Sequence, residues 1–179
     1  MEYNSIADIY AANRSIRKRF QRTVDGITSD EANAELEGEK WTVAALVEHV
    51  SIVEFNMSRI CGKLLAAAKE TGKSGDGSFS ISPEFAAKSA TIVDQKVEAP
   101  EFVHPKGGVA ISESVEKLDG STVELEAMRS DFESLDVTDH KFPHPFFGGL
   151  TAAEWLLIAG RHEARHLAQI ERLLATIRQ

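Results

Sequence analysis

Hydrophobic residues recur every three to four positions in four long stretches of the chain, at 5–27, 42–70, 111–135 and 151–179. This spacing is the period of an α-helix that buries one face and exposes the other. No stretch shows the alternation of hydrophobic and polar residues that marks a half-buried strand, and no internal repeat is present. The pattern predicts an all-α fold, a four-helix bundle whose apolar faces meet in a common core.

Residues that cap helices precede several of these stretches. Thr151 followed by Glu154 fits a capping box, in which each side chain accepts a hydrogen bond from the backbone N–H of the other residue. Thr28 and Glu31 repeat this pattern and indicate a short helical turn after the first helix. Thr42 can cap the second helix. These residues predict where the second and last helices begin.

Two long connections separate the predicted helices. Residues 71–110 are rich in Gly, Ser and Pro and lack helical periodicity apart from a turn near 84–96, so they predict a long crossover between the second and third helices. Residues 136–150 predict a loop that folds over one end of the bundle and buries three aromatic side chains, Phe142, Phe146 and Phe147. Within the third helix, Gly120 lies off the apolar face, so the helix either continues through it or restarts at Ser121.

The composition is that of an ordinary globular protein. With 179 residues, 42% hydrophobic and 27% charged, the chain is long enough for one domain, 1–179, with a sizeable core. A net charge of −8 repels phosphate backbones, so nucleic acid is not an expected partner. The N-terminal sequence lacks a secretory signal, and no apolar run is long enough to span a bilayer. The single cysteine, Cys61, cannot form an internal disulfide, and together these features predict a cytoplasmic protein.

Two histidines lie on the apolar face of the last predicted helix. His162 and His166 are four residues apart, so one imidazole lies a turn above the other and both point toward the expected core. A buried imidazole must be neutral, hydrogen-bonded or bound to a metal. The HxxxH pattern alone favours two core histidines that bond neighbouring carbonyl groups, because metal sites usually need a third ligand.

His49 can supply that third ligand from the second predicted helix. It lies on the edge of the apolar stripe, about two turns after the helix start. Three imidazoles from two helices would leave one position of a tetrahedral ion open for water or substrate, as in catalytic rather than structural sites. The sequence therefore predicts a metal site made of His49, His162 and His166.

Other polar residues near the predicted core have structural interpretations. Asn13 lies near the centre of the first helix's apolar face, where its amide either bonds a buried backbone group, the interpretation we favour, or contributes to a pocket around a metal. Glu48 and Glu54 flank His49 at angles of the second helix that predict exposure to solvent, although either could orient a metal ligand. His104 and His144 are expected in loops, and His144 can approach a pocket mouth without ligating a metal.

Three segments resemble the DinB-like (YfiT-type) metalloenzymes, and they span nearly the whole chain. They are Trp41-Thr42-Val43 with Glu48-His49, the sequence PHPFFGGLTAAEWLLIAGRHEARHLAQI at 143–170, and KVEAPEFVHPKGG at 96–108. The resemblance implies a four-helix bundle that holds a divalent ion, often nickel or zinc, by three histidines, which correspond to His49, His162 and His166. It also implies a homodimer. Some relatives act on low-molecular-weight thiols, as bacillithiol S-transferases or as mycothiol-dependent maleylpyruvate isomerase.

Three functions compete on these observations. The first is a metal-dependent enzyme, a thiol S-transferase, in which the ion lowers the pKa of a bound thiol and Glu163 or Arg165 makes outer contacts. The second is a zinc hydrolase, because HEARH matches the H-E-x-x-H motif with Glu163 as general base. Against it, only thirteen residues follow His166, which leaves no room for the usual distant downstream ligand. The metzincin extension also fails, because Gln169 stands where glycine is needed. The third is a non-catalytic dimeric binding protein that the metal stabilises.

Overall fold

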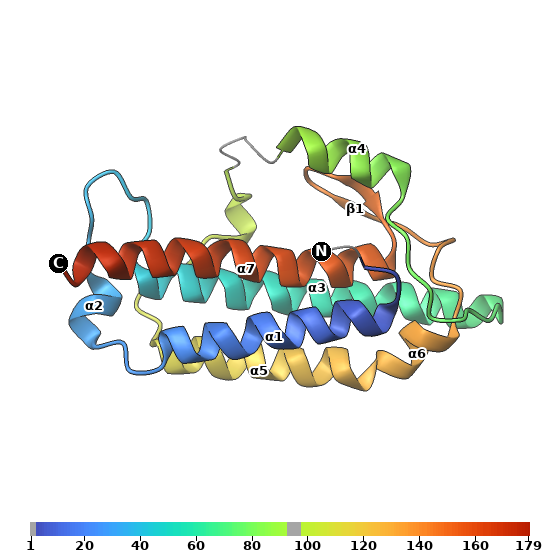
Figure 1. Cartoon of the computed structure of the whole chain (residues 1–179), viewed down its shortest axis with the longest axis horizontal. Helices are drawn as coiled ribbons and strands as arrows, with labels where there is room; N and C mark the ends of the chain where they lie inside the picture. The colour runs from blue at the N-terminus through green and yellow to red at the C-terminus, as the bar shows by residue number, and fades with distance from the viewer. Residues whose placement is uncertain (1–2, 93–97) are drawn as a thin grey trace.

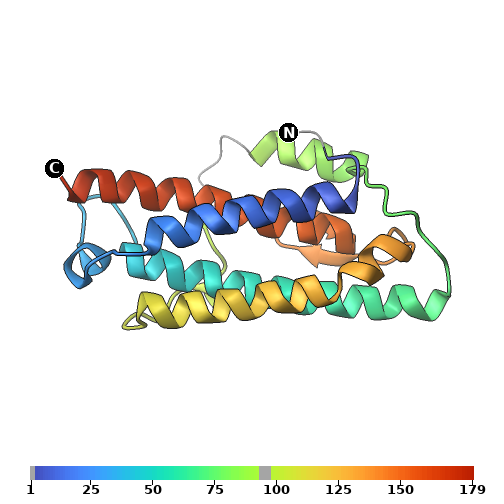
Figure 2. The same ribbon diagram turned by 60° about the horizontal axis from the view of Figure 1, so that its bottom comes forward.

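Four long helices lie side by side in the computed structural model, which describes residues 3–92 and 98–179 (Figures 1 and 2). Helix α3 packs against both α7 and α5, and α1 packs against α7. This arrangement confirms the predicted all-α four-helix bundle. The long helices are α1 (Ile6–Val24), α3 (Val43–Thr71), α5 (Ile111–Ala127) and α7 (Ala152–Ile177).

Shorter elements occupy the connections. The predicted crossover between α3 and α5 contains two of them and lies along one side of the bundle (Figure 1). The part of the expected turn near 84–96 that extends beyond residue 92 lies outside the described residues. The short helices are α2 (Ser29–Asn33), α4 (Pro83–Ile92), the 3₁₀ turn η1 (Glu101–Val103) and α6 (Arg129–Ser134).

The caps predicted at Thr28, Thr42 and Thr151 form, and at Gly120 the first of the two alternatives is confirmed. The Thr151–Glu154 and Thr28–Glu31 pairs both form complete capping boxes, and the Thr42 hydroxyl accepts a hydrogen bond from the backbone of α3. Helix α5 continues through Gly120 and ends at Ala127, so no new helix starts at residue 121. The third helix was predicted to be continuous to residue 135, but a break at Met128 separates α5 from α6.

A two-stranded hairpin corrects the prediction of a loop without strands at 136–150. Strand β1 (Phe142–His144) pairs antiparallel with β2 (Gly148–Leu150) immediately before α7. Gly148 has a φ of +77°, which a side-chain-bearing residue rarely adopts, and α4 lies close above it. The hairpin covers one end of the bundle, as expected, with the Phe142 ring against Trp155 and Phe147 packed on the core. The expected burial of Phe146 is wrong, because its side chain is exposed on the hairpin turn. Strands of three residues are too short to produce a visible alternation in the sequence.

The bundle core contains a buried cluster of charges. Arg17 of α1 donates from Nε to Glu163 of α7 at 2.6 Å, and its guanidinium also bonds Glu54 of α3 and the Leu118 carbonyl of α5. All three charged side chains are less than a tenth exposed. The expectation that Glu54 faces solvent is therefore wrong, because the arginine of a neighbouring helix satisfies it inside the core.

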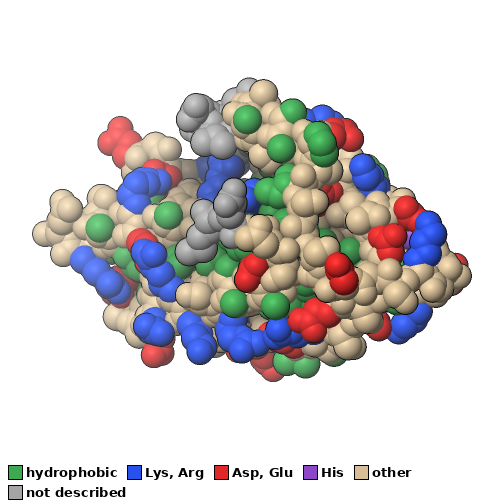
Figure 3. Space-filling model, turned by 45° about the vertical axis from the view of Figure 1, so that its right-hand side comes forward, with side chains coloured by type: hydrophobic (Ala, Val, Ile, Leu, Met, Phe, Trp, Pro, Cys, Tyr) green, Lys and Arg blue, Asp and Glu red, His purple; other side chains and the backbone are tan. Residues whose placement is uncertain are grey.

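The surface carries charges of both signs, interspersed on the face drawn in Figure 3. Among the helices of residues 3–92 and 98–179, none combines the length and the hydropathy that a membrane crossing requires.

Candidate metal centre

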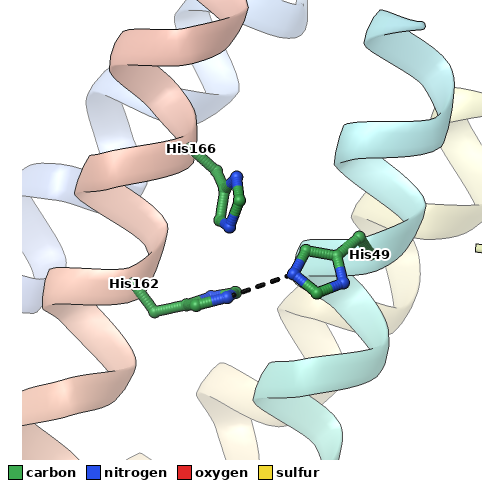
Figure 4. A group of neighbouring side chains, drawn as sticks. All are labelled: His49, His162 and His166. Carbon is green, nitrogen blue, oxygen red and sulfur yellow. Dashed lines mark hydrogen bonds between the residues drawn. The ribbon is translucent and has the colours of Figure 1, made fainter. Parts of the chain in front are cut away.

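His49 of α3 meets His162 and His166 of α7 between the two helices, as Figure 4 shows. Each residue offers one ligand atom, and these atoms lie within 4.8 Å of one another. The ring centroids are 4.5–5.1 Å apart. The convergence predicted from the sequence is thus observed, and in the described part of the chain no other residue joins this group.

Hydrogen bonds fix the proton positions on two of the rings. His49 Nδ1 lies 2.8 Å from the carbonyl oxygen of Val103, and His166 Nδ1 lies 3.2 Å from Oε1 of Gln169. Both oxygens only accept hydrogen bonds, so each Nδ1 carries the proton. The lone pair of each ring is therefore on Nε2, which is the atom available to a metal ion.

The third ring makes the group suitable for a cation. His162 Nε2 lies 3.2 Å from His49 Nε2, and its buried Nδ1 has no hydrogen-bond partner among the described residues. Since His49 Nε2 bears a lone pair, the neighbouring nitrogen must donate a proton to it or share a cation with it. A divalent ion can accept lone pairs from all three rings at once, and three imidazoles are a common zinc ligand set. The residues present therefore fit a bound metal.

Burial keeps the three imidazoles neutral. It lowers the pKa of His49, lowers that of His162 well below its ordinary value and lowers that of His166 to about 4. The neighbouring imidazoles act in the same direction on His162 and His166, because adjacent positive charges repel. Neutral imidazole is the form that binds metals, so no proton has to leave these rings near pH 7.

The crossover connection supports His49 from outside the bundle. Besides the bond from His49 to Val103, the buried carboxylate of Glu48 accepts hydrogen bonds from the backbone N–H groups of Lys106 and Gly107, at 2.9 and 3.0 Å. The expectation that Glu48 faces solvent is wrong, because it fastens this connection to α3. Trp41 packs against the His49 ring with centroids 4.8 Å apart.

Other candidate residues take structural positions. Asn13 Nδ2 donates to the Leu156 carbonyl at 3.0 Å, which confirms the favoured interpretation. His104 lies in a loop, as expected, but it is half-buried and bonds the carbonyl of Ala99. It also packs edge-on against Trp41, which in turn contacts the His49 ring.

Glu163 does not face the imidazoles. Its carboxylate is buried and bonds Arg17 at 2.6 and 3.3 Å, on the side of α7 that faces the core. A general base for hydrolysis must reach a water on the metal, and this carboxylate is held by an arginine instead. Arg165, in contrast, is exposed and makes no hydrogen bond or ion pair with a described residue.

Comparisons with known proteins agree with this fold and identify the superfamily. The chain is 24% identical over 149 residues to the uncharacterized protein YuaE of Bacillus subtilis (strain 168), covering 83% of this chain and 86% of that protein. A crystal structure titled as TT2238, a four-helix bundle protein, superposes with a TM-score of 0.63 at 21% identity, covering 94% of this chain and 99% of that chain. The latter similarity bears on the fold alone. Residues 12–170 match the DinB superfamily, and the chain therefore belongs to that superfamily.

Proposed function

We propose that this protein is a metal-dependent enzyme of the DinB type that transfers a low-molecular-weight thiol. His49, His162 and His166 would hold a divalent ion, zinc or nickel, and its open position would take the thiol sulfur. The observation that carries the proposal is the convergence of three neutral imidazoles, with Nε2 lone pairs on His49 and His166 and His162 Nε2 3.2 Å from His49 Nε2, and with no fourth protein ligand in the described residues. Three protein ligands and one open position are typical of catalytic metal sites.

The protein residues supply position and exclusion of water. The Val103 carbonyl and Gln169 Oε1 accept hydrogen bonds from the Nδ1–H groups of His49 and His166, which orients both rings and increases their basicity toward a metal. Trp41 covers one side of His49 and keeps water from it. When bound, a divalent ion lowers the pKa of a coordinated thiol, so a thiolate nucleophile can exist at neutral pH.

Elemental analysis and calorimetry test the proposal. Protein expressed without an affinity tag should contain about one equivalent of zinc or nickel, and the metal-loaded protein should bind glutathione or a related thiol. In His166→Ala, metal content and thiol affinity should fall together, at least tenfold in metal affinity. His140→Ala is the matched control, because His140 lies outside the three-histidine group. Thiol binding that is unchanged in His166→Ala would refute the proposal.

The two alternative functions, a zinc hydrolase and a non-catalytic binding protein, have less support from the geometry of the site. The arginine-bound position of Glu163 gives no basis for a zinc hydrolase in which it acts as general base. A non-catalytic role would show itself differently: chelation would lower the melting temperature, and no thiol would bind to the loaded protein. The homodimer that the resemblance implies remains a proposal, which light scattering of the eluted protein tests.

A further inference from the structure

His144 presents a hydrogen-bond donor whose position is set by the hairpin. The backbone N–H groups of Phe146 and Phe147 both point at His144 Nδ1, at 3.2 and 3.4 Å. A ring nitrogen that accepts hydrogen bonds carries a lone pair, so the proton of the neutral ring is on Nε2. This is the opposite tautomer to that of His49, whose Nδ1 carries the proton because it faces a carbonyl oxygen.

The ring is held firmly in this form. It packs against Trp155 and Phe147, with centroids 5.1 and 4.7 Å away. Burial lowers the pKa of His144 to about 4, so the ring is neutral near pH 7. In residues 3–92 and 98–179, no group accepts a hydrogen bond from His144 Nε2, although the atom is not enclosed by the protein. A half-buried N–H group without an acceptor is available to a ligand.

His144 lies on the same side of α7 as the three-histidine group. Its packing partner Trp155 precedes His162 by seven residues, which places it about two turns or roughly 10 Å away along the axis and on nearly the same face. A molecule bound beside His162 and extended toward the N-terminal end of α7 would therefore reach His144.

We propose that His144 Nε2–H donates a hydrogen bond to a carboxylate of the molecule whose thiol is held at the three-histidine group. The inference rests on the proposed function and names its substrate class, thiols that also carry a carboxylate some distance from the sulfur. Arg165, between His162 and His166 on α7 and without a described ionic partner, adds a positive charge that favours an anionic ligand. The negative charge of the nearby Glu163 reduces this attraction only slightly, since it is paired with Arg17.

The tautomer can be measured without metal or substrate. Long-range proton–nitrogen correlation spectra of the ¹⁵N-labelled, metal-free protein at pH 7 should show His144 Nδ1 as the unprotonated nitrogen and Nε2 as the protonated one. His144→Gln provides the assignment by loss of the signals. A protonated Nδ1 would overturn the proposal, because Nε2 would then be an acceptor.

Ligand preference can be measured in the cobalt(II)-loaded protein, whose visible absorption changes when sulfur binds the ion. The probes are 3-mercaptopropionate and 6-mercaptohexanoate, each compared with the corresponding mercapto alcohol. In the wild type, at least one acid should bind roughly tenfold more tightly than its alcohol, as expected for a hydrogen bond to a charged group. His144→Phe keeps an aromatic ring against Trp155 and should remove most of the preference, whereas His144→Gln retains a donor and should keep a larger part of it.

Each result is decisive. Equal binding of acids and alcohols by the wild type, or an unchanged preference in His144→Phe, would overturn the role of His144 and leave the proposed function intact. Loss of the preference in both variants would assign the ring to packing and also overturn it. Cobalt absorption that does not respond to any thiol would refute the proposed function itself, and the inference with it.

Discussion

Replacement of Arg17 by methionine should destabilise the bundle strongly. The guanidinium is bonded to two buried carboxylates, those of Glu54 and Glu163, and also donates to the Leu118 carbonyl at 2.9 Å and to the Thr122 hydroxyl at 2.6 Å. Methionine fills similar space but leaves two carboxylates facing each other without a counter-charge. Removing one partner of a buried ion pair costs about 3–5 kcal/mol, and that is the expected loss in free energy of unfolding.

Burial already raises the pKa of Glu54 to about 8, and the nearby Glu163 acts in the same direction. Arg17 acts in the opposite direction, so without it Glu54 should hold its proton more firmly, and a single negative charge then remains, which limits the loss to the lower part of the range. Urea unfolding followed by circular dichroism in EDTA measures it, since chelation removes any contribution from metal. A loss of this size shifts the midpoint by roughly 2 M for a slope of about 2 kcal/mol/M.

Arg14→Met is the matched control on the same helix. Arg14 pairs with Glu126 at 3.0 Å, but both side chains are more than a third exposed, so the change should cost less than about 1 kcal/mol. A rescue variant tests the mechanism: Arg17→Met combined with Glu54→Leu and Glu163→Leu should regain most of the stability, because apolar groups can replace a buried ion cluster. An Arg17→Met variant within 1 kcal/mol of the wild type would refute the reasoning.

Three further predictions concern other parts of the molecule. Gly160→Ala should lower the free energy of unfolding by about 1–3 kcal/mol, because the new methyl group would overlap the Asn13 amide oxygen. In the control Gly120→Ala the methyl group meets nothing within 4 Å, so that change should be neutral or stabilising. Equal effects of the two changes in urea unfolding would contradict this. The metal-free protein should lose stability as pH falls below 6.5, the ordinary pKa of histidine. In the unfolded chain His144 and His166 take up protons there, whereas burial lowers the pKa of both folded rings to about 4. A melting temperature that does not change from about pH 7 to about pH 4.5 would count against buried neutral rings. Zinc at a thousandfold excess over its dissociation constant should add about 4 kcal/mol in the wild type and far less in His166→Ala, measured by thermal unfolding.

Local sequence patterns were sufficient to predict the helices and the convergence of the three histidines. Helix periodicity and caps such as Thr151 act within a few residues, so they can be read without knowledge of the fold. His162 and His166 were recognisable because a polar pair on an apolar face needs a partner. His49 followed because the second helix offered one further imidazole facing inward.

The buried charges were not predictable in this way. Arg17, Glu54 and Glu163 each lie at the edge of an apolar stripe, where a charged side chain normally reaches solvent. They are buried because three helices bring them together, and that requires the tertiary arrangement. The contact between the Val103 carbonyl and His49 could not be predicted from the sequence either, since every residue carries a backbone carbonyl.

The attachment of the crossover at Glu48 and His49 has a thermodynamic consequence. Two successive residues of α3 bind a segment more than fifty positions later in the chain, one through a carboxylate and the other through the imidazole that would ligate the ion. Detachment of that segment would free the His49 ring to rotate, so transient opening of the crossover must weaken metal affinity. By reciprocity, ion binding should slow hydrogen exchange at the amides of Lys106 and Gly107, which makes this surface connection a reporter of site occupancy.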